Sequence, residues 1–222
     1  MLLETRDIVK AYTMGSAVVN AVDGISLAAA SGDFISIMGP SGSGKTTLLN
    51  LLGCIDRPTG GEVLVEGDNV AHLSNAALDR LRLHKIGFVF QRVNLIPILS
   101  AVENVELPMD MAGMKPAARR TRAMELLCAV GLERRSAHRP GQLSAGEQQR
   151  VGVARALAND PAVILADEPT GNLDSKTAAG ICDLLLSLNR RGQTIIMVTH
   201  DPEVGAIAAR RITIRDGRIS EQ

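Results

Sequence analysis

The sequence carries at positions 39–47 the stretch Gly39-Pro40-Ser41-Gly42-Ser43-Gly44-Lys45-Thr46-Thr47, and this stretch decides the fold. It fits the pattern G-x-x-x-x-G-K-[ST]. A buried-strand pattern at residues 33–38 precedes it, and an apolar run typical of a helix, Leu48–Leu52, follows it. Strand, glycine-rich loop and helix in this order form a site for phosphate groups. The glycines allow backbone angles closed to other residues, so successive N–H groups can point into one concavity.

We expect this phosphate loop, residues 39–47, to hold the phosphates of a nucleotide. The helix that begins near Lys45 presents the positive end of its dipole to the anion. Lys45 can reach the β- and γ-phosphates, and the Thr46 hydroxyl can ligate Mg²⁺. A turn rich in Gly and Ser can match the pattern by chance, but the flanking strand and helix favour a nucleotide site. The predicted nucleotide contacts of the loop are Gly39, Pro40, Ser41, Gly42, Ser43, Gly44, Lys45, Thr46 and Thr47.

A second candidate site element is the strand Ala162–Ala166, which ends in the adjacent carboxylates Asp167 and Glu168. Asp167 is placed to hold Mg²⁺, usually through water, and Glu168 is then available to polarise the attacking water. Hydrolysis at a phosphate loop depends on positioning and charge stabilisation more than on covalent help. An acidic turn after a strand is common by itself. Its combination with the phosphate loop favours the catalytic interpretation.

The composition excludes several other classes of protein. Hydrophobic residues make up 45% and charged residues 22% of the chain, as in an ordinary globular domain. The formal net charge is zero and aromatic residues make up only 2%, so neither a basic field nor a base-stacking surface predicts a nucleic-acid partner. The three cysteines are widely spaced and odd in number, which favours a reducing cytosol over a disulfide framework or metal site. The N-terminus lacks the apolar core of a signal peptide, and no apolar run approaches the ~20 residues that cross a bilayer.

Alternating strand-like and helix-like segments predict an α/β fold with a mainly parallel core sheet. The opening segment predicts an antiparallel hairpin with its turn at Met14-Gly15-Ser16. The middle of the chain has helical apolar spacing and is expected to form a subdomain inserted into the sheet. We therefore expect one domain over residues 1–222, with its core at about 1–92 and 160–222 and the inserted helical subdomain at about 93–159.

The segment that narrows the class is Leu143-Ser144-Ala145-Gly146-Glu147-Gln148-Gln149-Arg150. It resembles the LSGGQ signature of ABC transporter ATPases. The other elements of that family appear in order: Tyr12 as the adenine-stacking aromatic residue, Gln91 as the Q-loop glutamine, Asp167–Thr170 as the Walker B extension, Gly171–Asp174 as the D-loop and His200 as the switch histidine. The resemblance covers essentially the whole chain. It implies a P-loop NTPase of the ABC ATPase type, with an N-terminal antiparallel β subdomain and an inserted α-helical subdomain.

The resemblance implies an enzyme that hydrolyses ATP to ADP and phosphate and uses Mg²⁺. Two copies of the chain pack head to tail, with each ATP between the phosphate loop of one copy and the signature of the other. Ser144 and the Gly146 amide, at a helix N-terminus, then contact the γ-phosphate across the interface. Only ATP offers its terminal phosphate to both copies, so binding closes the dimer and hydrolysis lets it open.

Individual roles follow from the same resemblance. His200 holds the γ-phosphate and the attacking water, while Gln91 senses Mg²⁺ and links the site to a membrane partner. The implied catalytic residues are Glu168, His200 and Lys45, and the implied Mg²⁺ ligands are Thr46, Gln91 and Asp167. Outside the phosphate loop, the implied nucleotide contacts are Tyr12, Gln91, Ser144, Gly146, Glu168 and His200.

Single residues also have plainer interpretations. Tyr12 is open to a role in surface packing, and a histidine after a strand is often structural. Asp174 is suited to cap the helix that follows it, with or without a further role. The signature also departs from the family pattern, since Ala145 replaces its first glycine and Glu147 replaces its glutamine. A methyl group at residue 145 fits if the backbone there is helical, and no catalytic group is lost, so we expect an active ATPase.

Four further stretches resemble the branch of lipoprotein-release and macrolide-efflux ATPases, which also lies close to the cell-division ATPase. They are residues 48–53, 55–61, 87–91 and 103–108. The resemblance implies a peripheral protein at the cytoplasmic face of the inner membrane. It drives separate membrane permease subunits with a large extracytoplasmic domain.

The permease is expected to contact a groove formed by about Gln91–Met111. Its apolar residues either contact the permease or fill the core of the helical subdomain: Val93, Leu95, Ile96, Pro97, Ile98, Leu99 and Met109. Two alternative functions stay open, an importer ATPase and an ATP-gated clamp that regulates a cell-envelope or cell-division partner without transported cargo. The transported substrate is recognised by the membrane subunits in this family, and the sequence does not predict it.

Overall fold

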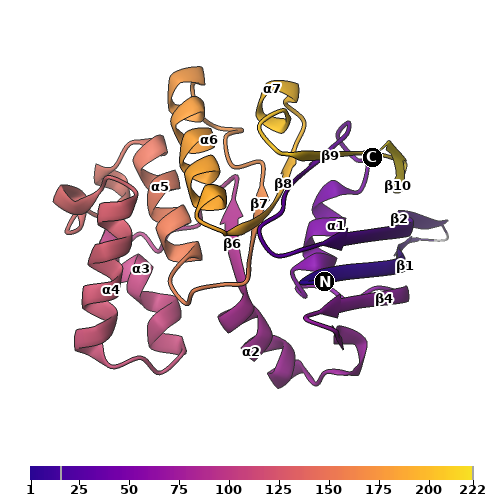
Figure 1. Ribbon diagram of the computed structural model, residues 1–222, viewed down its shortest axis with the longest axis horizontal. Helices are drawn as coiled ribbons and strands as arrows, with labels where there is room; N and C mark the ends of the chain where they lie inside the picture. The colour runs from indigo at the N-terminus through magenta and orange to yellow at the C-terminus, as the bar shows by residue number, and fades with distance from the viewer. Residues whose placement is uncertain (16, 222) are drawn as a thin grey trace.

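The computed structural model describes residues 1–15 and 17–221, in which the strands form two sheets (Figure 1). Ser16, part of the predicted N-terminal turn, lies outside the described residues. In the core sheet the strand order is β10-β9-β3-β8-β7-β6, with β9, β3, β8, β7 and β6 parallel and β10 antiparallel to β9. Its strands are β3 (Phe34–Met38), β6 (Ile86–Phe90), β7 (Val163–Asp167), β8 (Thr194–Thr199), β9 (Arg210–Arg215) and β10 (Arg218–Glu221). The predicted α/β fold with a mainly parallel core sheet is confirmed.

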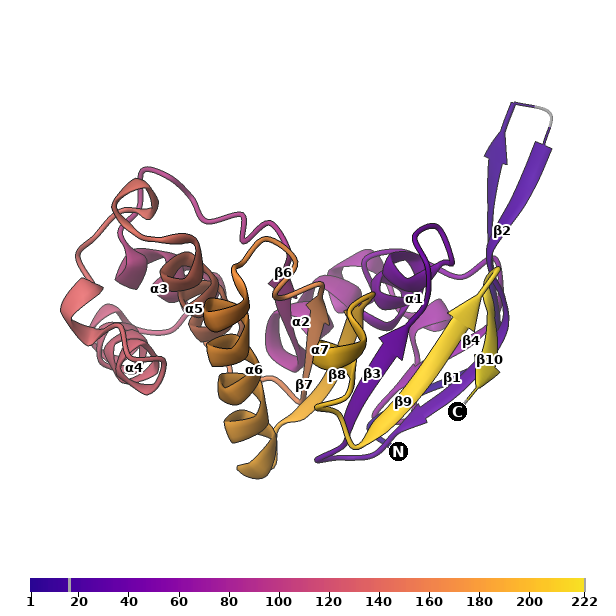
Figure 2. The ribbon, with the colours of Figure 1, turned by 90° about the horizontal axis from the view of Figure 1, so that it is seen from above.

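The N-terminal sheet is antiparallel, with the strand order β2-β1-β4-β5. Its strands are β1 (Leu3–Met14), β2 (Ala17–Ala29), β4 (Gly60–Val65) and β5 (Asp68–Asn69). Figure 2 shows the far ends of β1 and β2 reaching beyond the rest of the molecule as a two-stranded arm. The pairing of β1 with β2 is interrupted between Thr5 and Ile8, between Ile8 and Val9, and between Lys10 and Ala11.

The helices fall into two sets. A helical group of α3 (Ala101–Met111), α4 (Pro116–Ala129) and α5 (Ala145–Ala156) packs together at one end of the molecule (Figure 1). The helices α1 (Lys45–Leu52), α2 (Asn75–Lys85), α6 (Ser175–Arg190) and α7 (Pro202–Gly205) accompany the sheets. Gly113 and Gly131, both at positive φ, follow the ends of α3 and α4. The helical middle is therefore present as expected, whereas helix α2 was not predicted from the sequence.

The hydrophobic core lies on both faces of the core sheet. Along β7, Val163 and Leu165 join the cluster around α1 and the N-terminal sheet, while Ile164 and Ala166 join the cluster around α3, α4, α5 and α6. All four side chains are at most 1% exposed. A parallel sheet covered on both faces needs such continuous apolar strands. None of the described helices is both long and apolar enough to cross a membrane.

Truncation of a buried side chain on β7 should destabilise the fold. Leu165 is fully buried, so Leu165→Ala is expected to lower the free energy of unfolding by about 3 kcal/mol through lost contacts and a cavity. Urea denaturation followed by circular dichroism measures this. The control Val18→Ala, at a side chain 67% exposed, is expected to change stability by less than about 0.5 kcal/mol. Equal stability of the two variants would contradict the described core.

Candidate functional site

The phosphate loop is held between two other stretches of backbone. At Gly39 (φ 151°) a Cβ atom would lie 2.1 Å from the carbonyl oxygen of Ile214 on β9. At Gly44 (φ 100°) it would lie 2.0 Å from the carbonyl oxygen of Ala21 on β2. Real Cβ atoms do not approach so closely, so glycine is required at both positions. The predicted strand, loop and helix are confirmed as β3, residues 39–44 and α1.

Hydrogen-bond donors converge inside this loop. The Lys45 side chain is only 8% exposed, and its Nζ donates to the carbonyl oxygens of Gly39 (2.8 Å) and Pro40 (2.9 Å). The Ser43 hydroxyl is buried and has no hydrogen-bond partner among the described residues. The N-cap of α1 is Gly44, and no described side chain caps the first N–H groups of that helix. Ammonium, hydroxyl and free N–H groups together fit a phosphate chain.

Two oxygen ligands suited to a magnesium ion lie beside the loop. The Thr46 hydroxyl, at the start of α1, donates to Asp167 Oδ1 at 3.4 Å. Burial raises the pKa of Asp167, with the charge of Glu168 acting in the same direction and the Thr46 hydrogen bond and Lys45 opposing it. A hydroxyl and a carboxylate beside a phosphate site form the hard-oxygen donor set that Mg²⁺ prefers. The predicted pair Thr46 and Asp167 is thus brought together.

The side chains of Glu168 and His200 are also in contact, although the two residues follow different strands. Glu168 follows β7 in the left-handed region (φ 46°), and its N–H donates to the Val198 carbonyl oxygen at 2.9 Å. His200 follows β8, and its Nδ1 lies 2.8 Å from Glu168 Oε1. The Glu168 side chain is 15% exposed and that of His200 63%. A non-glycine residue at positive φ costs of order 1 kcal/mol, and such strain collects at functional sites.

Tyr12 lies on β1 and is 40% exposed. Its hydroxyl donates to Asp56 Oδ2 at 3.1 Å. Its cross-strand partner is Val19, two residues before Ala21, whose carbonyl oxygen touches Gly44. The predicted adenine residue therefore sits on the strand pair that packs against the phosphate loop.

The signature segment, residues 143–150, begins helix α5. Ser144 is the N-cap, and its hydroxyl accepts from the Glu147 N–H (3.2 Å) while the Glu147 carboxylate accepts from the Ser144 N–H (2.8 Å). The Ser144 N–H bond lowers the pKa of Glu147. Glutamate at position 147 thus completes a capping box, which gives this departure from the family pattern a local structural role. Ala145 is exposed at the first helical position, where a methyl group is tolerated.

Gly146 has a packing role inside the chain. It is buried, and a Cβ atom there would lie 2.2 Å from Thr177 Cγ2 on α6. Asp174 caps α6 as predicted, since it accepts from Thr177 N (3.0 Å) and from Thr177 Oγ1 (2.6 Å). The start of α5 is therefore pressed against the start of α6. Figure 1 and Figure 2 both place α5 beside α6 and apart from α1, so the signature segment and the phosphate loop do not meet within one chain.

Comparison with known proteins identifies the family. The sequence model of the family described as "ABC transporter" matches residues 22–171. The chain belongs to the ABC transporter family. It is an ATPase of that family.

Relatives about 50% identical to this chain match nearly all of it. An uncharacterized ABC transporter ATP-binding protein of Thermotoga maritima is 52% identical over 98% of this chain and 93% of its own length. The macrolide export ATP-binding/permease protein MacB of Hyphomonas neptunium is 52% identical over 98% of this chain, which spans only 34% of MacB. A dimeric structure of the ATP-binding cassette MJ0796 of Methanocaldococcus jannaschii, in a post-hydrolysis state bound to ADP and Pi, superposes with a TM-score of 0.91. It is 47% identical and covers 99% of this chain and 97% of its own.

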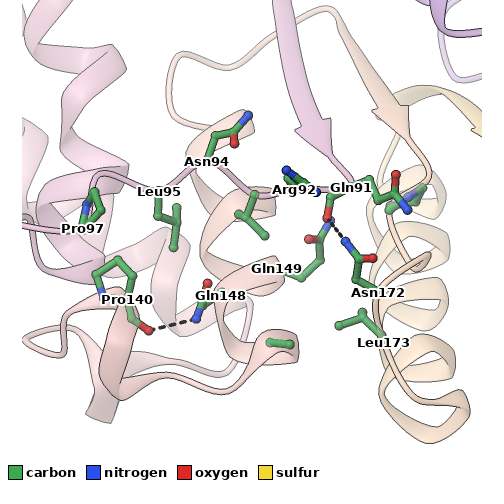
Figure 3. Close-up of a pocket in the computed structure, with 13 residues that line it drawn as sticks. Gln91, Arg92, Asn94, Leu95, Pro97, Pro140, Gln148, Gln149, Asn172 and Leu173 are labelled. Carbon is green, nitrogen blue, oxygen red and sulfur yellow. Dashed lines mark hydrogen bonds between the residues drawn. The ribbon is translucent and has the colours of Figure 1, made fainter.

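In this ABC ATPase, Gln91 belongs to a backbone segment, residues 90–94, that other elements hold in place. The adjoining groove has a volume of about 370 Å³. Figure 3 shows the side-chain amides of Gln149 and Asn172 directed toward the backbone of this segment. Gln149 donates to the Phe90 carbonyl oxygen (3.2 Å), and Asn172 donates to that of Gln91 (3.1 Å). The Gln91 amide also approaches Gly171, where a Cβ atom would lie 2.7 Å from its Nε2.

Helix α5 also holds this segment at residues 93 and 94. Arg155 donates to the carbonyl oxygens of Val93 (2.6 Å) and Asn94 (2.9 Å). Gly152 makes room for Val93, whose Cγ1 would lie 2.6 Å from a Cβ atom at position 152. The sequence placed Gln149 in the signature segment and Asn172 in the D-loop, but it did not predict that they and Arg155 hold residues 90–94. Their partners there are backbone carbonyls distant in the sequence. Burial lowers the pKa of Arg155.

A second, larger groove of about 780 Å³ is lined by residues of α2, the edge strand β6 and the helices α3 and α5. Its apolar lining includes Ile55, Phe88, Leu107 and Met111, and Met111 is 70% exposed. We call this the docking groove. The predicted range Gln91–Met111 contributes Asn94, Leu107, Pro108 and Met111 to its lining.

The apolar residues predicted near Gln91 divide between surface and core. Met109 is fully buried within the helical core, so the core interpretation, one of the two left open for it, holds for this residue. Leu95 is half-buried against the same cluster. Ile98, in contrast, is 76% exposed.

The Gly146–Thr177 contact predicts a stability effect. Gly146→Ala is expected to lower the free energy of unfolding by about 1–2 kcal/mol, because the new methyl group overlaps Thr177 Cγ2. Adding Thr177→Ser removes that methyl, keeps the hydroxyl bonded to Asp174, and should restore most of the loss. The control Ala145→Gly, at an exposed neighbour, should change stability by at most about 0.5 kcal/mol. Thermal and urea denaturation measure all four chains, and a Gly146→Ala chain as stable as wild type would refute the contact.

Proposed function

We propose that the chain is the ATP-hydrolysing cassette of an exporter, in which two copies close around two ATP molecules and thereby move a membrane permease. One observation supports this most directly. The phosphate loop and the N-terminus of α5 are both suited to phosphate, yet they lie apart within one chain. A γ-phosphate between two head-to-tail copies joins them. The dimeric structures of MJ0796 support the same arrangement.

In the proposed site each residue has a distinct task. The loop N–H groups, Ser43 and Lys45 hold the phosphates and balance their charge. Thr46 and Asp167, with Gln91 as the proposed further ligand, would hold a magnesium ion, which would supply positive charge to the phosphate oxygens. Tyr12 stacks on adenine. The remaining loop residues Gly39, Pro40, Ser41, Gly42, Gly44 and Thr47 complete the proposed cradle.

Glu168 and His200 act on the attacking water. Glu168 accepts a hydrogen bond from the water and polarises it, while His200, held 2.8 Å from Glu168, orients toward the γ-phosphate. The water oxygen attacks the γ-phosphorus, the bond from that phosphorus to the β,γ-bridging oxygen breaks, and the water proton passes to the phosphate product. ADP and inorganic phosphate result. Loss of the γ-phosphate removes the contact to Ser144 and Gly146 of the second copy, so the dimer opens.

The permease is proposed to dock in the docking groove at the cytoplasmic face of the membrane. MacB and the pyoverdine export protein PvdT are named as combined ATP-binding and permease proteins, and the chain spans about a third of each. They support export and a membrane partner with which this cassette works. The groove offers exposed Met111 and Ile55, and its lining includes Phe90 and Asn94, so a helix seated there would lie next to the Gln91 segment.

The role of Glu168 can be tested directly. Glu168→Gln is expected to lower the ATP hydrolysis rate at least about 100-fold, because the amide polarises water poorly. The same variant should form dimers with ATP and not with ADP, as measured by light scattering after size exclusion. The control Glu133→Gln, at an exposed glutamate of the short turn Glu133–Arg135, should hydrolyse ATP like wild type. A Glu168→Gln chain with near wild-type turnover would contradict the assignment.

The docking groove can be tested in the native cell. Met111→Asp places a charge in the apolar lining, so the fraction of the chain that sediments with membranes should fall several-fold. Val18→Asp, at a side chain of similar exposure on the β1–β2 arm, should leave that fraction unchanged. An equal membrane-bound fraction for Met111→Asp and wild type would place the permease contact elsewhere.

A further inference from the structure

Tyr12 lies near the end of strand β1, where contacts with the hydrophobic core do little to fix its ring. It lies toward the end of the β1–β2 arm that Figure 2 shows extending from the molecule, and it is 40% exposed. A stacking residue at such a place loses side-chain entropy when a base binds, unless other groups already hold its rotamer. Two charged side chains supply that restraint.

Asp56 contacts the Tyr12 hydroxyl group, and Lys10 contacts the Tyr12 ring. The Tyr12 hydroxyl donates to Asp56 Oδ2 (3.1 Å), and Lys10 Nζ donates to Asp56 Oδ1 (2.7 Å). The same ammonium lies 5.2 Å from the centroid of the Tyr12 ring, within the range of a cation–π contact. One face of the ring is thus covered by Lys10 while the side chain as a whole remains accessible.

Other contacts hold Lys10 and Asp56 in place. The Lys10 side chain is only 12% exposed, and its ammonium also donates to the Arg57 carbonyl oxygen (2.8 Å). The Arg57 N–H donates to Asp56 Oδ1 (2.7 Å). Burial alone would raise the pKa of Asp56, but the hydrogen bonds from Lys10, Arg57 and Tyr12 leave it below its usual value. The carboxylate is therefore charged and fixed at neutral pH.

This anchor belongs to the segment that leaves α1, the helix of the phosphate loop. The Ile55 and Asp56 N–H groups both donate to the Asn50 carbonyl oxygen of α1, at 2.9 and 3.3 Å. At the other end of α1, Gly44 touches the Ala21 carbonyl oxygen on β2. The hairpin that carries Tyr12 is consequently tied to both ends of the helix that carries the phosphate site.

We propose that Lys10 and Asp56 are positioning residues for the nucleotide base. They hold the Tyr12 ring in one orientation, with one face against Lys10 and the other free for an adenine, at a distance from the phosphate loop that α1 fixes. The inference rests on the proposed stacking role of Tyr12. It assigns to Lys10 and Asp56 a contribution to base affinity and none to phosphate affinity.

The test compares ADP with pyrophosphate, a ligand that lacks the adenosine and therefore the base. Calorimetry measures the Kd of ADP and of inorganic pyrophosphate, so neither hydrolysis nor dimer closure enters the result. Tyr12→Leu removes the ring and is expected to raise the Kd for ADP about tenfold. Tyr12→Phe keeps the ring but loses the bond to Asp56, and Lys10→Met loses the ammonium. Each is expected to raise the Kd for ADP about threefold, the size of one modest hydrogen bond. The Kd for pyrophosphate should stay constant in all three.

Lys85→Met is the matched control, because it removes another lysine–carboxylate pair, with Glu66 at 2.9 Å, outside the proposed site. It should leave both affinities unchanged. Wild-type ADP affinity in Tyr12→Phe and Lys10→Met, beside a weakened Tyr12→Leu, would overturn the positioning role and leave the stacking role intact. Wild-type affinity in Tyr12→Leu would overturn both roles without touching the proposed hydrolysis. A parallel loss of pyrophosphate affinity would show general damage to the fold and would also overturn the inference.

Discussion

The close approach of three backbones at the phosphate loop is the constraint on which the rest of the structure depends. Gly39 lies against Ile214 of β9, and Gly44 lies against Ala21 of β2, with no space for a side chain at either contact. The Gly217 N–H also donates to the Ser43 carbonyl oxygen (3.1 Å). The loop therefore joins the core sheet to the N-terminal sheet and cannot relax away from either. Donors fixed in this way meet an anion without having to reorganise, which is the condition for electrostatic catalysis.

A second rigid connection runs through helix α5. Ser144 caps its start, and Gln149, Gly152 and Arg155 follow along the helix to hold residues 90–94. A movement of the helical group thus carries the Gln91 segment with it. The docking groove, which Arg155 and Asn94 help to line, lies on the same connection. In the proposed cycle this helix links three places: the γ-phosphate of the second copy, the magnesium-sensing glutamine and the permease contact.

The sequence predicted those parts of the site that depend on neighbouring residues. The phosphate loop, the acidic end of β7 and the cap of α6 at Asp174 each follow from residue types at short fixed spacing. Contacts between residues far apart in the sequence are not marked by any such short spacing. Gln149 and Asn172 lie 59 and 81 residues from the carbonyl groups they hold, and Asp56 lies 44 residues from Tyr12.

Other features could not be predicted because tertiary packing decides them. Helix α2 has one buried apolar residue, Leu78, so its apolar periodicity is weak. Met109 turns inward although its neighbours in sequence border the docking groove. The left-handed backbone of Glu168 likewise arises from the strand pairing around it and from its N–H bond to Val198.

The central claim is that the ATP site is completed by a second copy of the chain. Two differently tagged chains test it, both with Glu168→Gln to retain ATP and Cys128→Ser to remove the exposed cysteine. One carries Ser41→Cys in the phosphate loop and the other Ala145→Cys in the signature segment. A short bifunctional maleimide should join the two tags when ATP is present and should fail to join them with ADP. Absence of the ATP-dependent product in the mixture, with both cysteines shown to be reactive, would contradict the account.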